Sequence, residues 1–379
     1  MVENTAHIDA MNRPWYLLLT ANQWLFCRID WVSAIATLGC CVILLLQRDV
    51  VSAGAAGFAL VYALAFADNV GWAIRNFSRI EIVMNGIERI REYTEIEQEA
   101  PAIIEDSRPP VEWPQHGAIH VERLSVQYTP NASPTLQNLS LDVQPGERIG
   151  IVGRSGAGKS TLSAALFRFL EASSGRIIID GIDISTIGLY DLRSRLAIIP
   201  QDPGLFSGTV RSNLDPFGEN HDADIWDALR RCHLVEQDMW ADHITNIKSL
   251  DMPVADHGSN FSHGQRQLLA MARALLRHSK VIIMDEATAS IDFETDAKIQ
   301  KTIRESFRDS TLLCIAHRLR TVIDCDRVLV LDAGRLVEYD KPSALILRRN
   351  GTFRRLCERS GEFDVLLSMA QDAACRFVD

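Results

Sequence analysis

The stretch Gly153-Arg154-Ser155-Gly156-Ala157-Gly158-Lys159-Ser160 decides the fold of this chain. An apolar run typical of a buried strand, 149–152, precedes it, and a helical stretch beginning at Thr161 follows. Glycines at these positions let the backbone curl, so that N–H groups and the helix N-terminus point at phosphates. Lys159 is expected to reach the β- and γ-phosphates, and the Ser160 hydroxyl to bind Mg²⁺. The strand–loop–helix context therefore predicts a nucleotide-binding P-loop.

Short apolar runs alternate with helical stretches on both sides of this loop, from about residue 118 to residue 358. Examples of such runs are GRIIIDG (175–181), KVIIMDE (280–286) and TLLCIAH (311–317). Continuous apolar strands separated by helices predict a largely parallel sheet that is covered on both faces. The expected fold class is an α/β P-loop NTPase.

Two acidic residues, Asp285 and Glu286, follow the apolar strand 281–284. Such a strand in a P-loop protein supplies an aspartate to the metal shell. Glu286 lies where the strand gives way to a loop, so it can face the γ-phosphate and polarise an attacking water. The alternative is an ordinary strand end with solvated acids, which the nearby P-loop disfavours.

A second helix N-terminus has a small, hydroxyl-bearing entry loop, residues 260–267, before the helical stretch 268–277. Such a terminus is a potential anion site. One domain rarely needs two phosphate cradles. We therefore expect this loop to serve a nucleotide that a different domain holds.

Two uncharged runs, 31–46 and 50–67, lie near the N-terminus, and each is close to the length that crosses a bilayer core of about 30 Å. Four of the seven tryptophans lie near the ends of these runs, as in interfacial belts. Arginines at positions 28, 75, 79, 89 and 91 put both outer ends in the cytoplasm. The pattern predicts a membrane hairpin with helices at about 31–47 and 50–75; a buried hairpin of a soluble domain is the alternative.

Helical spacing of apolar residues continues beyond the second run, so this helix is expected to extend into the cytoplasm to about residue 97. Residues 1–100 would then form a partial transmembrane domain. Prolines mark a linker at 101–117, before the ATP-binding domain at 118–358 and a C-terminal tail at 359–379. A two-helix hairpin is too small for a transport path, so we expect the chain to be part of something larger.

Composition excludes several classes of protein. Subtracting 49 acidic from 39 basic residues gives a net charge of −10, and 47% of the residues are apolar. The chain is therefore neither a disordered tail nor a basic nucleic-acid binder. Its eight cysteines show no CxxC pair and no zinc-binding spacing, and the N-terminus lacks a secretory signal. A secreted, disulfide-built protein is not expected.

Five ordered motifs resemble those of a known family. They are the P-loop, IPQDP (199–203), FSHGQRQ (261–267), VIIMDEATASID (281–292) and IAHRL (315–319). This order is similar to that in the nucleotide-binding domain of an ATP-binding-cassette (ABC) transporter. The multidrug-resistance-associated (C) subfamily is indicated by LFSGTVRSNLDPF (205–217) and GEFDVL (361–366). ANQWLFCRID (21–30), VSAG (51–54) and IERIREYTEIEQEAP (87–101) resemble the last two helices of its second membrane domain.

The resemblance implies roles for individual residues on the ATP that this domain holds. Tyr128 would stack on adenine, and Gln201 would contact Mg²⁺ and report nucleotide state to the membrane part. Glu286 would be the general base. His317 would hold the γ-phosphate and the attacking water. Ser160, Gln201 and Asp285 would together form the protein part of the metal site.

The resemblance also implies a partner domain. Ser262, Gly264 and Gln265, with His263 between them, would act in trans on the ATP of a second cassette. Ser290 and Asp292 would line the seam with that cassette. Phe261 and His263 depart from the more common LSxGQ pattern; Phe261 should contribute packing, and His263 is interpreted as a solvated loop histidine rather than a charge near phosphate.

The substrate side rests on one helix face. Trp72 and Arg75 share a face near the cytoplasmic end of the last membrane helix, with Asp68 and Arg79. Arg75 could pair with an anionic conjugate while Trp72 stacks on its apolar body. An interfacial anchor for lipid headgroups is the alternative interpretation.

Together these patterns predict an ATP- and Mg²⁺-dependent exporter of amphipathic organic anions or conjugates, in a plasma or vacuolar-type membrane with its ATPase domain in the cytoplasm. Its partners would be a second nucleotide-binding domain, further membrane helices and the lipid bilayer, but no nucleic acid. The alternatives are an ATP-gated channel or regulatory ABC protein, and a truncated, non-transporting remnant. A soluble ABC ATPase of DNA repair or translation is disfavoured by the apolar hairpin and the acidic charge.

Overall fold

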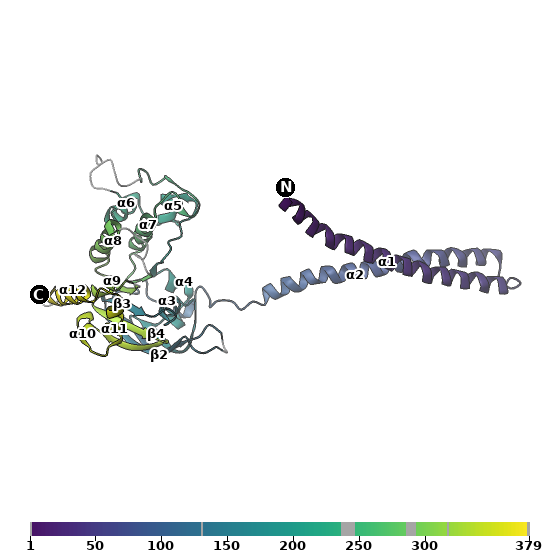
Figure 1. Ribbon diagram of the computed structural model, residues 1–379. Coiled ribbons are helices and arrows are strands. Elements are labelled where there is room, and N and C mark those ends of the chain that lie inside the picture. The colour runs from purple at the N-terminus through teal and green to yellow at the C-terminus, as the bar shows by residue number, and fades with distance from the viewer. Residues whose placement is uncertain (1, 130–131, 236–246, 286–292, 317, 377–379) are drawn as a thin grey trace. The chain divides into compact units, whose positions relative to one another are not determined.

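The computed structural model describes residues 2–129, 132–235, 247–285, 293–316 and 318–376 (Figure 1). The chain divides into two compact units, Met1–Glu99 and Ala100–Asp379. The first unit consists of helices, whereas the second combines sheets and helices.

The first unit contains two long helices, α1 (Val2–Leu46) and α2 (Ala53–Thr94). Helix α1 begins at Val2 and not near residue 31, because the apolar run marks only the part of the helix that is free of charge. Helix α2 begins after Ser52, whose hydroxyl oxygen accepts a hydrogen bond from the amide of Ala55. It then runs without a break to Thr94.

Both helices are long and apolar enough to cross a membrane, by length and composition. Their large apolar side chains are mostly exposed; Leu46, for example, is 80% exposed and Trp31 72% exposed. Two helices cannot bury such a surface against each other, and apolar surface of this extent marks contact with lipid or with further helices. The pair fits a membrane-spanning segment.

The second unit is built on a six-stranded sheet with the order β12-β11-β3-β10-β9-β6. Its strands are β3 (Arg148–Gly153), β6 (Leu196–Ile199), β9 (Val281–Asp285), β10 (Thr311–Ile315), β11 (Arg327–Asp332) and β12 (Arg335–Asp340). All neighbouring strands pair in parallel except β11 with β12. The largely parallel sheet that the sequence predicts is confirmed.

A separate antiparallel sheet has the order β2-β1-β4-β5. Its strands are β1 (Ile119–Val126), β2 (Leu136–Val143), β4 (Ala172–Ile179) and β5 (Ile182–Asp183). The apolar run GRIIIDG (175–181) predicted a strand of the parallel sheet, and this was wrong because β4 pairs antiparallel with β1. A short apolar run indicates burial but not which sheet the strand joins. Strands β7 (Gly208–Thr209) and β8 (Pro253–Val254) form a two-stranded ladder.

Helices cover the sheets and form a further lobe. They are α3 (Lys159–Leu166), α4 (Leu189–Arg193), α5 (Val210–Leu214), α6 (Asp222–Arg231), α7 (His263–Leu276), α8 (Phe293–Ser306), α9 (Leu319–Ile323), α10 (Pro342–Leu347), α11 (Thr352–Arg359) and α12 (Phe363–Arg376). Short 3₁₀ turns lie at Glu105–Ser107, Ile184–Thr186 and Asp256–Gly258. Figure 1 shows α5, α6, α7 and α8 gathered in one lobe, apart from α3.

Three apolar clusters hold this unit together. One fills the lobe around α7, one lies between the antiparallel sheet and the face of the parallel sheet that α3 covers, and one lies under the C-terminal helices. Leu366 and Ala370 of α12 are almost fully buried in the third cluster. Residues 363–376, which the sequence places in a tail, therefore pack onto the domain as a helix.

His120 on β1 makes a pH-dependent contact across the antiparallel sheet. Its ring contacts Asp142 on β2, and its Nε2 lies 3.1 Å from Glu122 Oε1. The hydrogen bond with Asp142 is the main cause that raises the pKa of His120 above its ordinary 6.5.

We expect His120 to titrate above pH 6.5 in the folded protein. A raised folded pKa gives stability that is complete below the unfolded pKa and is lost as the pH rises through the folded one. The effect on unfolding should be small because the pair is exposed. Histidine NMR titration measures it: Asp142→Asn should lower the pKa of His120, and a wild-type value below 6.5 would contradict the assignment.

Candidate nucleotide-binding site

Several of the residues predicted to bind nucleotide or metal lie at one edge of the parallel sheet, at the carboxyl ends of its strands. Strand β3 ends at Gly153, β9 ends at Asp285, and β6 runs into the loop that carries Gln201. Because these strands are parallel, their carboxyl ends meet at a common edge, which is where open α/β sheets bind ligands.

The P-loop connects β3 to α3 and needs glycine at two positions for different reasons. Gly158, the N-cap of α3, has φ +99°, and a Cβ there would lie 2.7 Å from Leu136 Cδ2. At Gly153 a Cβ would lie 2.4 Å from the carbonyl oxygen of Leu331. Gly158 allows the left-handed turn into the helix, and Gly153 allows the end of the strand to pack closely against β11.

Lys159 is enclosed within this loop. It is 7% exposed, and its Nζ donates hydrogen bonds to the carbonyl oxygens of Gly153 (2.8 Å) and Arg154 (3.2 Å). A lysine buried this deeply needs partners for its charge. The ammonium group is thus held against the loop, the position from which a P-loop lysine reaches phosphate oxygens.

Ser160 and Thr161 lie in the first turn of α3, where the helix leaves its backbone N–H groups without intrahelical partners. The hydroxyl of Tyr128 lies 3.2 Å from the hydroxyl of Thr161. Tyr128 is otherwise 59% exposed. The structure therefore brings the residue predicted to stack on adenine to the P-loop helix and leaves more than half of its surface open to solvent.

We expect Tyr128→Ala to weaken ATP binding by about 1–3 kcal/mol, which is the usual contribution of a ring stacked on a base. Tyr128→Phe is the matched control, because it removes the hydrogen bond to Thr161 and keeps the ring. Equilibrium binding of a fluorescent ATP analogue measures both variants. Equal losses in the two variants would contradict stacking as the role of Tyr128.

The structure describes only some of the residues that are predicted to bind metal or to act in catalysis. Asp285 is partly buried at the end of β9, and Gln201 is exposed in the loop after β6. Glu286, Ser290, Asp292 and His317 lie outside the described residues.

The side chains present fit Mg²⁺ bound together with a nucleotide. Among the described residues no group of three or more His, Cys, Asp or Glu side chains could hold a metal ion by itself. Ser160, Gln201 and Asp285 are oxygen donors, the type that Mg²⁺ prefers, and Mg²⁺ usually combines few protein ligands with phosphate and water. A metal site of this kind is complete only when the phosphates of the nucleotide are bound.

The second predicted anion loop forms the N-terminus of α7. Ser262 is its N-cap: its Oγ accepts a hydrogen bond from the amide of Gln265 (3.2 Å), and Gln265 Oε1 accepts one from the amide of Ser262 (2.9 Å). This is a capping box, and the spacing S-x-x-Q could have predicted it. The mutual bonds fix both side chains, while the hydroxyl proton of Ser262 can still be donated.

The residues next to Ser262 are buried or partly buried. Phe261 is 6% exposed within the apolar cluster around α7, so its expected packing role is confirmed. Gly264 is buried. His263 lies in the first turn of α7 with its side chain 32% exposed, and its Nε2 is 4.0 Å from Asp202 Oδ1. His263 is therefore a residue of the helix and not of the loop before it, and its side chain is partly exposed.

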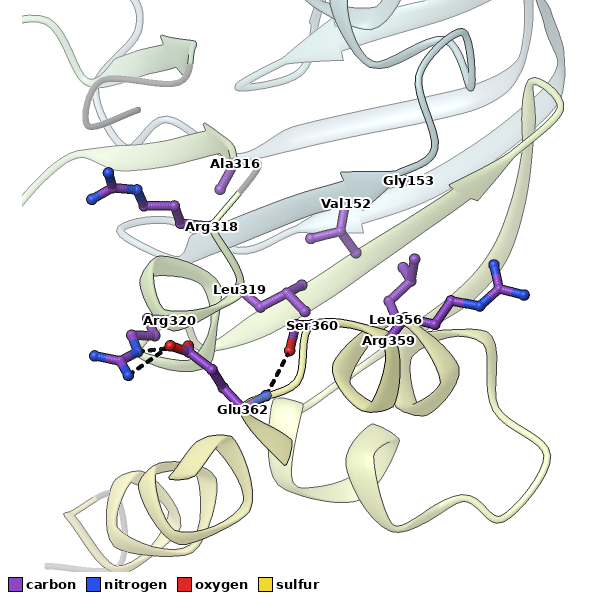
Figure 2. A pocket seen from close by; sticks show the side chains of 10 residues that line it. All are labelled: Val152, Gly153, Ala316, Arg318, Leu319, Arg320, Leu356, Arg359, Ser360 and Glu362. Atoms are coloured by element: carbon purple, nitrogen blue, oxygen red, sulfur yellow. Dashed lines mark hydrogen bonds and ion pairs between the residues drawn. The ribbon is translucent and has the colours of Figure 1, made fainter. Parts of the chain in front are cut away.

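A hollow of about 540 Å³ lies beside the start of the P-loop (Figure 2). Val152, Leu319 and Leu356 form its apolar floor, and the bidentate ion pair of Arg320 with Glu362 closes one side. Among the predicted site residues that the structure describes, Gly153 alone lines it. The hollow is thus a neighbour of the P-loop and not the phosphate cradle itself.

One support of the P-loop was missed in the sequence. The turn between β11 and β12 contains Gly334, whose amide donates a hydrogen bond to the carbonyl oxygen of Ala157 in the P-loop (3.2 Å). A Cβ on Gly334 would lie 2.1 Å from the carbonyl oxygen of Thr135. The signal was an Asp-Ala-Gly turn between two apolar runs.

The candidate substrate contacts lie in the first unit. Trp72 is 64% exposed on α2. The guanidinium of Arg75 lies 4.5 Å from the ring centroid of Phe26 on α1, and its Nε donates a hydrogen bond to the carbonyl oxygen of Gly71 (3.4 Å). Arg75 therefore has a packing role between the helices, whatever else it contacts.

The fold and the P-loop define this protein as a P-loop nucleotide-binding protein of the α/β class, with its site at the carboxyl edge of a parallel sheet. Residues 136–289 match the family model of the ABC transporter domain. The chain belongs to the ABC transporter family and corresponds to a C-terminal part of a transporter of the C subfamily.

Curated relatives match nearly the whole chain. It is 45% identical over 389 residues to the ATP-dependent bile acid permease of Saccharomyces cerevisiae, covering 98% of the chain and 23% of that protein. It is 43% identical over 362 residues to the metal resistance protein YCF1 of S. cerevisiae, covering 94% of the chain and 24% of that protein. With the ABC transporter C family member 3 of Dictyostelium discoideum, identity is 44% over 95% of the chain and 25% of that protein. The chain thus spans about a quarter of the length of these relatives.

Proposed function

We propose that the chain supplies the second nucleotide-binding domain and the last two membrane helices of an exporter that couples ATP hydrolysis to transport. The observation that carries this proposal is the enclosed Lys159 in a glycine-shaped P-loop, in the same chain as two long apolar helices. The family membership supports it, because these relatives are transporters.

In this proposal the P-loop amides and Lys159 bind the phosphates, and Tyr128 stacks on adenine. Ser160, Gln201 and Asp285 hold Mg²⁺, which neutralises charge on the β- and γ-phosphate oxygens when bound. Glu286 accepts a proton from the attacking water. His317 orients the γ-phosphate and that water.

A second cassette completes the reaction. The capping box of Ser262 and Gln265 holds the N-terminus of α7 ready for the γ-phosphate of the partner's ATP. His263 and Gly264 lie in the first turn of the same helix, and Ser290 and Asp292 would line the seam. ATP would thus be sandwiched between the two domains, and hydrolysis would release the sandwich.

The proposed substrates are amphipathic organic anions or conjugates. One relative is named as a bile acid permease and another, from Candida glabrata, as an efflux transporter of multiple drugs. Trp72 and Arg75 offer an aromatic face and a cation on α2 for such a molecule. The membrane would be the plasma or a vacuolar-type membrane, with the ATPase domain in the cytoplasm.

Transport into inside-out vesicles tests the function. Vesicles that contain the assembled protein should take up a fluorescent anionic conjugate when ATP is added, and should not do so with a non-hydrolysable analogue. Lys159→Met is the inactive control. ATP-gated ion current without uptake would contradict export and would support a channel. Absence of both uptake and current would contradict both functions.

A further inference from the structure

A strap, defined as residues 101–113, lies along the short helix α4. The carbonyl oxygen of Pro101 accepts a hydrogen bond from the amide of Leu189 (3.1 Å). That of Ala102 accepts one from the amide of Tyr190 (2.8 Å). The first N–H groups of a helix have no intrahelical partner, and the N-cap residue of α4, Gly188, has no side chain that could cap them. The strap therefore supplies the N-terminal cap of this helix.

The approach of the strap to α4 is close enough to require glycine. A Cβ on Gly188, the N-cap residue, would lie 2.4 Å from the carbonyl oxygen of Ala102 and 2.7 Å from Ile103 Cα. The φ of Gly188 is −67°, which any residue adopts. The absence of a side chain thus serves the contact with the strap and not the backbone conformation.

An ion pair joins the middle of the strap to α4. Arg108 Nη2 lies 3.1 Å from Asp191 Oδ1. Asp191 is 8% exposed, and its Oδ2 is buried without a hydrogen-bond partner in the described part of the chain. Because a buried carboxylate depends on its partners, loss of Arg108 should be felt at Asp191.

The far end of the strap is fastened beyond the C-terminus of α4. Trp113 is 3% exposed and donates a hydrogen bond from Nε1 to the carbonyl oxygen of Ile179 (2.9 Å). Arg195, in the turn between α4 and β6, donates hydrogen bonds to the carbonyl oxygens of Val111 and Trp113. The strap thus contacts the start and the middle of α4 and the turn that follows this helix.

Helix α4 leads through strand β6 into the loop of Gln201. Strand β6, which follows α4, is the last strand in the order of the sheet and pairs with β9. The next residue, Pro200, has its carbonyl oxygen hydrogen-bonded by Gln267 Nε2 (3.2 Å). An edge strand has a single neighbouring strand in its sheet. Its position therefore depends more strongly on the helix before it than the position of a central strand does.

We propose that the strap is a positioning element for Gln201, with Arg108 and Asp191 as its positioning pair. The strap holds α4, and α4 sets the place of β6 and of the Gln201 amide that would contact Mg²⁺. This inference rests on the proposed role of Gln201 as a metal contact. A residue that orients a metal contact from outside typically changes metal affinity about 10- to 100-fold when replaced.

The test measures the Mg²⁺ dependence of ATP binding by the whole chain in lipid nanodiscs. Arg108→Glu should lower the apparent Mg²⁺ affinity about tenfold and leave binding of metal-free ATP, in EDTA, unchanged. A general loss of structure would weaken both. The double variant Arg108→Glu with Asp191→Arg should restore the wild-type value. The matched control is Arg304→Glu, because Arg304 is as exposed as Arg108 and pairs with Asp324, and this variant should keep the wild-type Mg²⁺ affinity.

Wild-type Mg²⁺ dependence in Arg108→Glu, or failure of the folded double variant to restore it, would overturn the proposal. Gln201→Ala distinguishes this failure from failure of the proposed function. If Gln201→Ala lowers Mg²⁺ affinity and Arg108→Glu does not, only the strap inference is wrong. If Gln201→Ala has the Mg²⁺ dependence of the wild type, Gln201 does not contact the metal. In that case the proposed role of Gln201 and the inference about the strap are both wrong.

Discussion

Replacement of Glu286 by glutamine is expected to lower ATP turnover by about 10²- to 10⁴-fold while ATP binding is retained. Glu286 directly follows Asp285, the last residue of β9 at the carboxyl edge of the sheet. A glutamine keeps the size and polarity of the side chain but cannot accept the proton of the attacking water. Steady-state phosphate release and equilibrium ATP binding, measured on the assembled protein, separate the two effects.

Asp285→Asn is the companion variant for this experiment. Asp285 is proposed to hold the metal, so its loss should weaken Mg²⁺-dependent binding as well as turnover. Glu286→Gln should affect turnover alone and should let the ATP-bound state accumulate. Wild-type turnover in Glu286→Gln would overturn the assignment of Glu286 as the general base.

Replacement of Lys159 by methionine is expected to weaken ATP binding by about 10- to 150-fold. Hydrogen bonds to charged groups contribute about 1.5–3 kcal/mol, and each 1.4 kcal/mol is a factor of ten. Methionine fills similar space but cannot donate to a phosphate oxygen or to the carbonyl oxygens of Gly153 and Arg154. Binding of a fluorescent ATP analogue measures the loss.

Lys280→Met is the matched control for Lys159→Met. Lys280 precedes β9 at the amino end of that strand, which is the edge opposite to the P-loop, and its Nζ donates a hydrogen bond to the carbonyl oxygen of Asp309 (3.4 Å). The Lys280→Met variant should bind ATP with the affinity of the wild type. Thermal unfolding of both variants shows whether either change disturbs the fold. Equal ATP affinity in wild type and a folded Lys159→Met would contradict the phosphate-binding role.

Several features of the fold were readable because their signals are local. The P-loop is a pattern of glycines, lysine and serine within eight consecutive residues, and its glycines are needed for a turn that the same residues make. The strand before Asp285 is a continuous apolar run, and burial on both faces of a parallel sheet explains it. The first apolar run similarly indicated a helix, although α1 begins well before it.

Contacts between distant parts of the chain were not readable in the same way. The strap contains prolines and acidic residues, a composition that predicts a linker, yet Arg108 holds it on α4 and Trp113 holds it on the end of β4. Whether such a segment docks depends on the surface that it meets. That surface includes Gly188, which looks like an ordinary turn glycine in the sequence.

The sequence by itself determined the class of this protein: the P-loop, the order of the cassette motifs and the apolar helices all follow from patterns within short stretches. The tertiary structure alone decided that β4 joins the antiparallel sheet, that Tyr128 meets Thr161, and that Pro101 and Ala102 cap α4. The physical reason is that periodicity and composition report how a segment is buried. Which segment becomes its partner depends on the fit between surfaces that lie far apart in the chain.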